Sequence, residues 1–130
     1  MACRITEIAV DCTDPEALAR FWTAALGYEV GQTEDGYVEL VPPEGAGPAV
    51  PTIGLLRVPE PKAVKNRLHL DVSATDRTRD EEVERLLALG ATRADVGQGP
   101  LDSGGVTWVV LADPEGNEFC VLRTRVDPLA

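Results

Sequence analysis

Short stretches of alternating or apolar residues in the first half of the chain surround one stretch with helical spacing. The stretches that predict strands are residues 4–10, 28–30, 37–41 and 52–58. Apolar side chains three and four residues apart between Leu18 and Leu26 predict a helix with one buried face, which begins near Pro15 and ends at Gly27. The first half is therefore expected to form a strand, a helix and three further strands.

The second half of the chain repeats this order. When the second half is aligned with the first at one constant offset, His69 corresponds to Glu7. At a second constant offset, Trp108 corresponds to Tyr37. A helix is predicted over about residues 80–89, and its Ala-Leu-Gly end matches the end of the first helix. Because an internal repeat outweighs local propensity, we predict two βαβββ modules, each with a curved sheet that has one helix-covered face and one open face.

The chain is expected to form a single domain over residues 1–130. Module one spans about residues 4–58, a linker with two prolines spans about 59–64, and module two spans about 65–126. A hydrophobic content of 44% is sufficient for a core that needs no metal ion or disulfide.

Charge and cysteine content exclude several classes of function. The net charge of −10 repels phosphate backbones and anionic lipid, so neither nucleic acid nor a membrane is expected as a partner. No apolar run approaches the roughly 20 residues that span a bilayer, and the N-terminus lacks the order of a signal peptide. The three cysteines form no even disulfide framework and no paired zinc motif. A cytoplasmic location is expected.

The only histidine lies in a predicted strand over residues 66–72. Alternation places Arg67, His69 and Asp71 on one face and the apolar residues between them on the other. Arg67 and Asp71 can form an exposed ion pair worth at most about 1 kcal/mol, or Arg67 can hold an anionic group of a substrate. The polar face is therefore a candidate binding site, and a purely structural histidine is the alternative.

The repeat also gives His69 a counterpart. Glu7 and His69 occupy equivalent strands, so in a shared cleft they would face each other. A carboxylate and an imidazole can hold a divalent cation, or they can act as general base and acid. Glu118 shares a face with Cys120 in the closing strand, so it is either a ligand or base, or a solvent-facing carboxylate.

Other residue types narrow the chemistry further. Tyr37 and Trp108 either wall the cleft or fill the core, and Cys120 is expected to be a buried small hydrophobe rather than a nucleophile. The sequence contains no glycine-rich phosphate loop, no Gly-x-Ser-x-Gly elbow and no His-Glu-x-x-His helix. Phosphoryl transfer and serine hydrolysis are therefore not expected.

Three segments resemble the vicinal oxygen chelate superfamily, which includes glyoxalases, bleomycin-resistance proteins and extradiol dioxygenases, and in particular its glyoxalase-like domains. They are residues 14–22 with the following Leu26-Gly27, residues 67–72, and residues 111–122, whose sequence LADPEGNEFCVL is the most specific. The resemblance covers nearly the whole chain. It implies an α+β fold in which two tandem βαβββ modules form a cupped, partly open mixed sheet with helices on the outer face, usually completed as a homodimer.

Catalytic members of this superfamily hold a divalent metal ion. Carried over by position, the resemblance implies metal ligands at Glu7, His69 and Cys120, and a Zn, Mn, Ni or Fe ion. The chain departs from the family pattern, because a glutamate replaces one expected histidine and a thiol replaces the expected carboxylate. Glu118 lies on the same face as Cys120 and could substitute for it, and the absence of any cofactor is the alternative.

The resemblance implies a cleft for a small molecule. One expectation is a lyase or isomerase that acts on a small oxygenated metabolite, with His69, Glu7 and Glu118 as catalytic residues. The expected substrate contacts are Arg67, Asp71, Tyr37 and Trp108. The other expectation is a non-catalytic protein that binds an antibiotic or metabolite, as drug-resistance members of the superfamily do.

Overall fold

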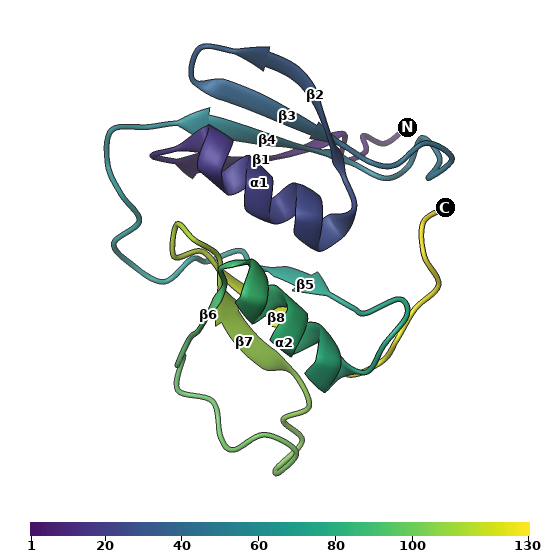
Figure 1. The fold of residues 1–130 in the computed structure, drawn as a ribbon, viewed down its shortest axis with the longest axis vertical. Helices are drawn as coiled ribbons and strands as arrows, with labels where there is room; N and C mark the ends of the chain where they lie inside the picture. The colour runs from purple at the N-terminus through teal and green to yellow at the C-terminus, as the bar shows by residue number, and fades with distance from the viewer. The chain divides into compact units, whose positions relative to one another are not determined.

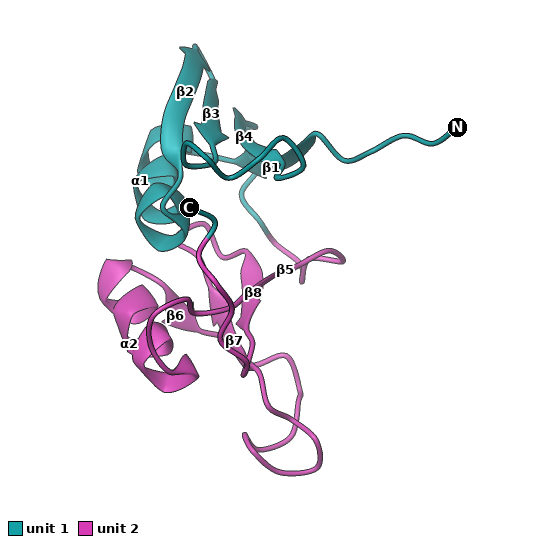
Figure 2. Ribbon diagram, turned by 90° about the vertical axis from the view of Figure 1, so that its right-hand side faces the viewer, with its two compact units in different colours: residues 1–62, 129–130 teal, residues 63–128 magenta.

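A computed structural model describes residues 1–130. The chain runs through a strand, a helix and three strands, and then through the same series again (Figure 1). It divides into two compact units: unit 1 contains residues 1–62 and 129–130, and unit 2 contains residues 63–128 (Figure 2). The two βαβββ modules and the α+β class predicted from the repeat are confirmed.

Unit 1 is a four-stranded mixed sheet with one helix. Its elements are β1 (Glu7–Cys12), α1 (Pro15–Leu26), β2 (Glu29–Glu34), β3 (Tyr37–Val41) and β4 (Thr52–Arg57). The strand order is β1-β4-β3-β2; β1 runs parallel to β4, and the other pairs are antiparallel. The parallel pair β1 and β4 needs a long crossover connection, and α1, β2 and β3 supply it.

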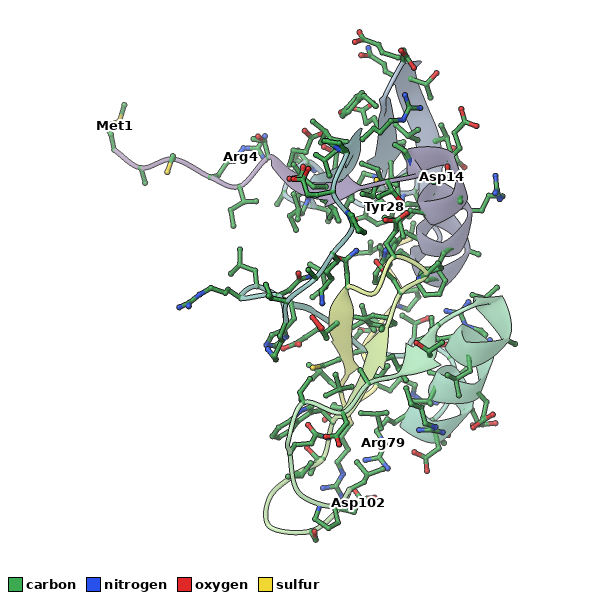
Figure 3. The ribbon with its side chains drawn as sticks, turned by 90° about the vertical axis from the view of Figure 1, so that its left-hand side faces the viewer. Met1, Arg4, Asp14, Tyr28, Arg79 and Asp102 are labelled. Atoms are coloured by element: carbon green, nitrogen blue, oxygen red, sulfur yellow. The ribbon has the colours of Figure 1, made fainter.

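The helix α1 forms where its sequence signals predict. Asp14 caps its N-terminus by accepting a hydrogen bond from the Ala17 backbone N–H at 3.1 Å, and it lies at the first turn in Figure 3. Gly27 ends the helix in the left-handed conformation, with φ of 70°. The buried face carries Phe21 and Trp22, whose rings meet edge to face at 5.0 Å. This face packs on β3 and β4 and builds the core of unit 1.

Unit 2 repeats the topology with shorter strands. Its elements are β5 (Leu70–Val72), α2 (Arg79–Leu89), β6 (Thr92–Arg93), β7 (Val109–Ala112) and β8 (Glu118–Val121). The strand order is β5-β8-β7-β6, and β5 runs parallel to β8. The sheet of unit 2 therefore has the same mixed pairing as the sheet of unit 1.

The core of unit 2 lies between α2 and one face of its sheet. Thr78 and Glu81 form a reciprocal capping box at the start of α2, which satisfies two backbone N–H groups. Leu111, Phe119 and Val121 are almost fully buried on the β7 and β8 strands. The alternate residues of the same strands point to the opposite face. Neither helix of the structure is long and apolar enough to cross a bilayer.

The strand around the histidine begins later than predicted. β5 starts at Leu70 rather than at residue 66, and Leu68 is 89% exposed instead of sharing a buried face. The partner strand β8 begins at Glu118, which lies opposite His69 in this register, so residues 66–68 have no strand to pair with. Asn66 is held by side chains instead: its backbone N–H donates to Glu118 Oε1 at 2.9 Å, and its amide donates to Asn117 Oδ1 at 3.0 Å.

Candidate functional site

A pocket of about 480 Å³ opens on the sheet face of unit 2 that α2 does not cover. It is lined by Lys65, His69, Asp71, Val96, Gly97, Gln98, Trp108, Val110, Glu118, Cys120 and Leu122. The lining residues of β7 and β8 alternate with the buried core residues of the same strands, as the pleat requires. Its volume lies in the range of small-molecule sites.

Three potential metal ligands converge in this pocket. His69 Nδ1 lies 2.9 Å from Asp71 Oδ1, and Cys120 Sγ lies 3.8 Å from His69 Nδ1. The ligand atoms of the three residues all lie within 4.8 Å of one another. The sheet register explains the arrangement, because Asp71 is directly paired with Cys120 across the parallel β5–β8 ladder. His69 precedes Asp71 by two residues and therefore lies on the same side of the chain.

The imidazole of His69 is oriented by the Asp71 carboxylate. In the tautomer with hydrogen on Nδ1, the ring donates to Asp71 Oδ1, which leaves Nε2 as an acceptor. The carboxylate therefore fixes both the orientation and the tautomer of the ring. The His69 side chain is 42% exposed, so a ligand in the pocket can reach it. The pair can act as a base or as a metal ligand.

Burial and the Asp71 charge keep the Cys120 thiol protonated. Burial is the larger cause, and the negative charge of Asp71 and a hydrogen bond to it add to the effect; together they raise the pKa of Cys120 to about 11. Lys65 acts in the opposite direction and is the weakest of these influences. Cys120 is therefore not an activated nucleophile, as expected from the sequence, and it becomes a thiolate ligand only where a metal ion displaces its proton.

Glu118 and Trp108 line the same pocket, and Arg67 does not. Glu118 accepts the Asn66 backbone hydrogen bond, so one of its oxygens ties down the segment before β5. Arg67 is exposed, and the hydrogen-bond partner of Asp71 is His69. Asp71 lines the pocket beside His69, and the roles of Arg67 and Asp71 as substrate contacts stay predictions.

A second group of predicted residues comes together in unit 1. Glu7 Oε1 accepts hydrogen bonds from the Tyr37 hydroxyl at 2.9 Å and from the Thr52 hydroxyl at 3.2 Å. The carboxyl group lies over Gly54, where a Cβ atom would come within 3.1 Å of Glu7 and 3.0 Å of the Tyr37 ring. Glycine at position 54 therefore makes room for this cluster. Glu7 and His69 belong to different units, and their pairing stays a prediction.

The Tyr37 phenol should titrate unusually late because of this cluster. Burial, the hydrogen bond to Glu7 and the nearby carboxylates raise the pKa of Tyr37 to about 12. We expect Glu7→Gln to lower this pKa toward the ordinary value of 10.0, because glutamine can still accept the hydrogen bond but carries no charge. The measurement is the phenolate absorbance between pH 9 and 13 in a Tyr28→Phe background. Glu16→Gln on α1 is the control, and equal pKa values in both variants would contradict the assignment.

Some pocket residues had no clear signal in the sequence. Val96, Gly97 and Gln98 come from the long connection between β6 and β7, and Lys65 comes from the linker. The only hint was the glycine-rich composition of the connection, which is typical of a loop that approaches a ligand. Gln98 donates from Nε2 to the Trp108 carbonyl oxygen at 3.2 Å, and so it joins the two ends of the connection.

Two βαβββ units, with polar residues gathered on their open sheet faces, define a protein of the vicinal oxygen chelate type. The chain belongs to the glyoxalase-like domain family, whose model matches residues 7–122. The sequence-based resemblance to this group is confirmed. Among curated proteins, none matches the sequence.

Solved structures of the same fold cover nearly the whole chain. A glyoxalase/bleomycin resistance protein/dioxygenase family enzyme from Burkholderia phytofirmans PsJN is 19% identical, with a TM-score of 0.66, and the match covers 92% of this chain and 97% of that one. The fosfomycin resistance protein FosX from Mesorhizobium loti is 14% identical, with a TM-score of 0.69 and coverage of 97% and 95%. At these identities the similarity establishes the fold alone.

A third structure was determined with a bound metal ion. It is a mutant of the fosfomycin resistance protein FosX from Listeria monocytogenes, complexed with Mn(II) and 1S,2S-dihydroxypropylphosphonic acid. This protein is 15% identical to the chain, with a TM-score of 0.70 and coverage of 94% of this chain and 90% of that one.

Proposed function

We propose that the pocket of unit 2 binds a small oxygenated metabolite and catalyses a lyase or isomerase reaction on it. The observation that carries this proposal is the convergence of His69, Asp71 and Cys120 in a pocket of small-molecule size. In this proposal His69 transfers a proton to or from the substrate. Glu118, which lines the same pocket, is a supporting carboxylate. A fold of this kind serves many reactions, so the proposal rests on the site and not on the fold.

The donor set fits a divalent metal ion. Zinc bonds to nitrogen, oxygen and sulfur are about 2.0–2.3 Å long, so neighbouring donors in a tetrahedral site lie about 3.4 Å apart. The distances of 2.9 Å from His69 to Asp71 and 3.8 Å from His69 to Cys120 lie on either side of this value. An imidazole, a carboxylate and a thiol favour Zn, Ni or Fe over harder ions such as Mg. A bound ion would supply Lewis-acid polarisation of a substrate oxygen.

The residues of the pocket can carry the proton transfer themselves. When no metal ion occupies Nδ1, Asp71 accepts a hydrogen bond from His69 Nδ1–H, and Nε2 is then free to take a proton from a substrate carbon or hydroxyl. Lys65 is the one cationic side chain of the lining and is suited to a developing oxyanion. Trp108 and Val110 supply an apolar wall that limits water.

The proposal keeps two features that the family resemblance suggests. Glu7, with its hydroxyl donor Tyr37, would serve as the partner of His69 in the assembled cleft. The assembled form would be a homodimer, and the domain would extend over residues 1–130 with the module boundaries near residues 58 and 65. Light scattering on the purified chain tests the dimer, because a dimer has twice the mass of the 13.9 kDa chain.

A non-catalytic binding protein is the second candidate. The observation in its favour is the composition of the pocket lining. The lining has an aromatic side chain, Trp108, and two carboxylates, Asp71 and Glu118, but only one amine, Lys65. An acidic pocket with a tryptophan is suited to a cationic organic guest. In this case His69 would need neither a metal ion nor a proton-transfer role.

One experiment separates the two candidates. Thermal stabilisation of the wild type and of His69→Gln is measured across divalent metal ions and a panel of hydroxyketones, epoxides, hemithioacetals and cationic antibiotics, followed by turnover of each stabilising compound. An enzyme of the proposed kind should turn over a compound and lose this activity in His69→Gln. Binding without turnover that survives in His69→Gln would overturn the proposed activity and favour the binder.

A further inference from the structure

The connection between β6 and β7 forms part of the pocket wall, yet it contains little that would hold it in place. Residues 95–105 include no fully buried side chain and four glycines, at positions 97, 99, 104 and 105. Its turn is formed by residues 100–106, where the Asp102 N–H donates to the Val106 carbonyl oxygen and Asp102 has a positive φ of 61°. A chain of this composition has high conformational freedom when it is not anchored.

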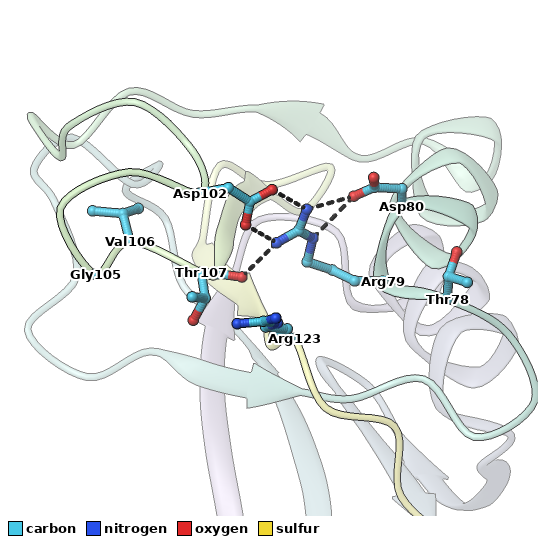
Figure 4. Close-up of a pocket in the computed structure, with 8 residues that line it drawn as sticks. All are labelled: Thr78, Arg79, Asp80, Asp102, Gly105, Val106, Thr107 and Arg123. Carbon is cyan, nitrogen blue, oxygen red and sulfur yellow. Dashed lines mark hydrogen bonds and ion pairs between the residues drawn. The ribbon is translucent and has the colours of Figure 1, made fainter.

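Arg79 anchors this connection from the first turn of α2. Its guanidinium donates to both carboxylate oxygens of Asp102, at 2.9 and 3.0 Å, and to the Thr107 carbonyl oxygen at 2.8 Å (Figure 4). Asp80 accepts a further hydrogen bond from Nε at 2.9 Å. The Arg79 side chain is only 10% exposed, although it is flanked by exposed carboxylates. A guanidinium that donates two parallel hydrogen bonds to one carboxylate forms a strong and directional ion pair.

The anchor reaches the pocket through one peptide unit. Arg79 holds the Thr107 carbonyl oxygen, which belongs to the peptide bond that leads into Trp108. The next carbonyl oxygen, that of Trp108, accepts the hydrogen bond from Gln98. Trp108 and Gln98 both line the pocket, whereas Arg79 and Asp102 lie outside it. The backbone on both sides of the Trp108 ring is thus fixed by side chains.

We propose that Arg79 is a positioning residue for this pocket: by clamping Asp102 and Thr107 it sets the place of Trp108 and Gln98 in the wall. It has no contact with a ligand and acts only through the connection. The clamp is independent of whether the pocket binds a metal ion, because His69, Asp71 and Cys120 lie on or beside β5 and β8. The effect on the pocket should therefore be local to the wall formed by residues 96–98 and 108.

The helix holds Arg79 at a fixed point. Thr78, the residue before it, is the N-cap and is locked by the reciprocal bonds with Glu81. Figure 4 shows Arg79 and Asp102 turned toward one another from α2 and from the connection. The clamp therefore joins a capped helix to a glycine-rich connection that has few buried contacts of its own, so the connection depends on it for local stability.

The test compares Arg79→Gln and Asp102→Asn with the wild type by hydrogen exchange and by acrylamide quenching of tryptophan fluorescence. Asparagine tolerates the positive φ of position 102, so Asp102→Asn removes the charge without adding backbone strain. Arg77→Gln is the matched control, because Arg77 pairs with the neighbouring Asp76 and not with the connection. Quenching reports on Trp108, since Trp22 is only 3% exposed.

Both variants should raise the exchange of amides in residues 96–108 by about tenfold and increase the quenching constant by about twofold, as expected for loss of a local restraint. The double variant should show no further increase, and Arg79→Lys should recover part of the protection. Unchanged exchange and quenching in both single variants would overturn the proposal. A uniform rise in exchange through the whole of unit 2 would also overturn it, because Arg79 would then be a general stabilising residue.

The clamp should hold across the neutral range and fail in acid. The hydrogen bonds from Arg79 hold the pKa of Asp102 below its ordinary value of 3.8, and the charge of Arg123 acts in the same direction. A carboxyl group with a lowered pKa contributes its interaction above that ordinary value and loses it as pH falls through the folded-state pKa. Asp80 is the second carboxylate that faces Arg79, at 2.9 Å. Trp108 quenching should be constant from pH 8 to 5 and rise only below about pH 3.8.

Discussion

His69→Ala is expected to weaken binding of Zn²⁺ by at least about 100-fold, since loss even of an outer-shell partner costs 10–100-fold. His69 Nδ1 is the donor common to the two short distances of the cluster, 2.9 Å to Asp71 and 3.8 Å to Cys120. Removal of the imidazole leaves a carboxylate and a protonated thiol, which form a poor site. Isothermal titration of the metal-stripped protein measures the loss.

The neighbouring residues supply graded comparisons for this result. Asp71→Asn should weaken the binding of every divalent metal ion. Cys120→Ser should weaken the binding of Zn²⁺ more than that of Mn²⁺, because sulfur ligands favour softer ions. Glu118→Gln is the matched control: it lines the same pocket but lies outside the cluster. Equal Zn²⁺ affinity in wild type and His69→Ala, or a loss as large in Glu118→Gln, would contradict the assigned ligand set.

Asp113→Ala is expected to lower the free energy of unfolding by about 2–4 kcal/mol, because it removes the buried acceptor of several partly buried donors. Asp113 is 3% exposed and lies in the turn between β7 and β8. Its Oδ1 accepts the backbone N–H groups of Glu115 at 2.9 Å and Asn117 at 3.0 Å, and the Asn117 amide donates to both carboxylate oxygens. This turn sets the register that places Glu118 and Cys120 in the pocket.

Urea unfolding of the wild type, Asp113→Ala and Asp113→Asn measures this effect. Asparagine keeps one acceptor oxygen and so should lose about half as much stability as alanine, by the count of hydrogen bonds retained. Glu115→Ala is the surface comparison, because it leaves the Asp113 acceptor and the backbone donors in place. A loss below about 0.5 kcal/mol in Asp113→Ala, the range of ordinary surface substitutions, would show that the turn does not depend on this carboxylate.

The repeat made most of the fold predictable from the sequence. Each half has a capped helix with one apolar face after a strand, and each ends with two strands around a turn, so the modules could be inferred without knowledge of their contacts. Strand ends were less accessible to prediction. The strand at His69 starts at Leu70, because its length depends on how far the partner β8 extends, and that partner is distant in sequence.

The site was predictable in part for the same reason. Alternation along one strand placed His69 beside Asp71, and the closing strand placed Cys120 and Glu118 on one face; both arrangements need only local geometry. The repeat also singled out Glu7 and Tyr37 as counterparts of His69 and Trp108, but the hydrogen bond between Glu7 and Tyr37 was not predicted from it.

Side-chain contacts made by loops could not be predicted from the sequence pattern. Arg79 and Asp102 are 23 residues apart and meet only because a glycine-rich connection folds back on α2. Gln98 reaches the Trp108 carbonyl oxygen across the same connection. Neither pair has a periodic signal, because hydrophobic periodicity reports on helices and strands and not on the course of a loop.

The central claim is that His69, Asp71 and Cys120 form the reactive centre of the pocket, and crystals grown with Zn²⁺ test it most directly. An anomalous difference map recorded at the zinc edge locates the ion without assumptions about activity. The account predicts a peak at about 2.0–2.3 Å from a His69 nitrogen, an Asp71 oxygen and the Cys120 sulfur, as zinc ligands require. A map with no peak in the pocket, while the His69–Asp71 hydrogen bond remains intact, would contradict it.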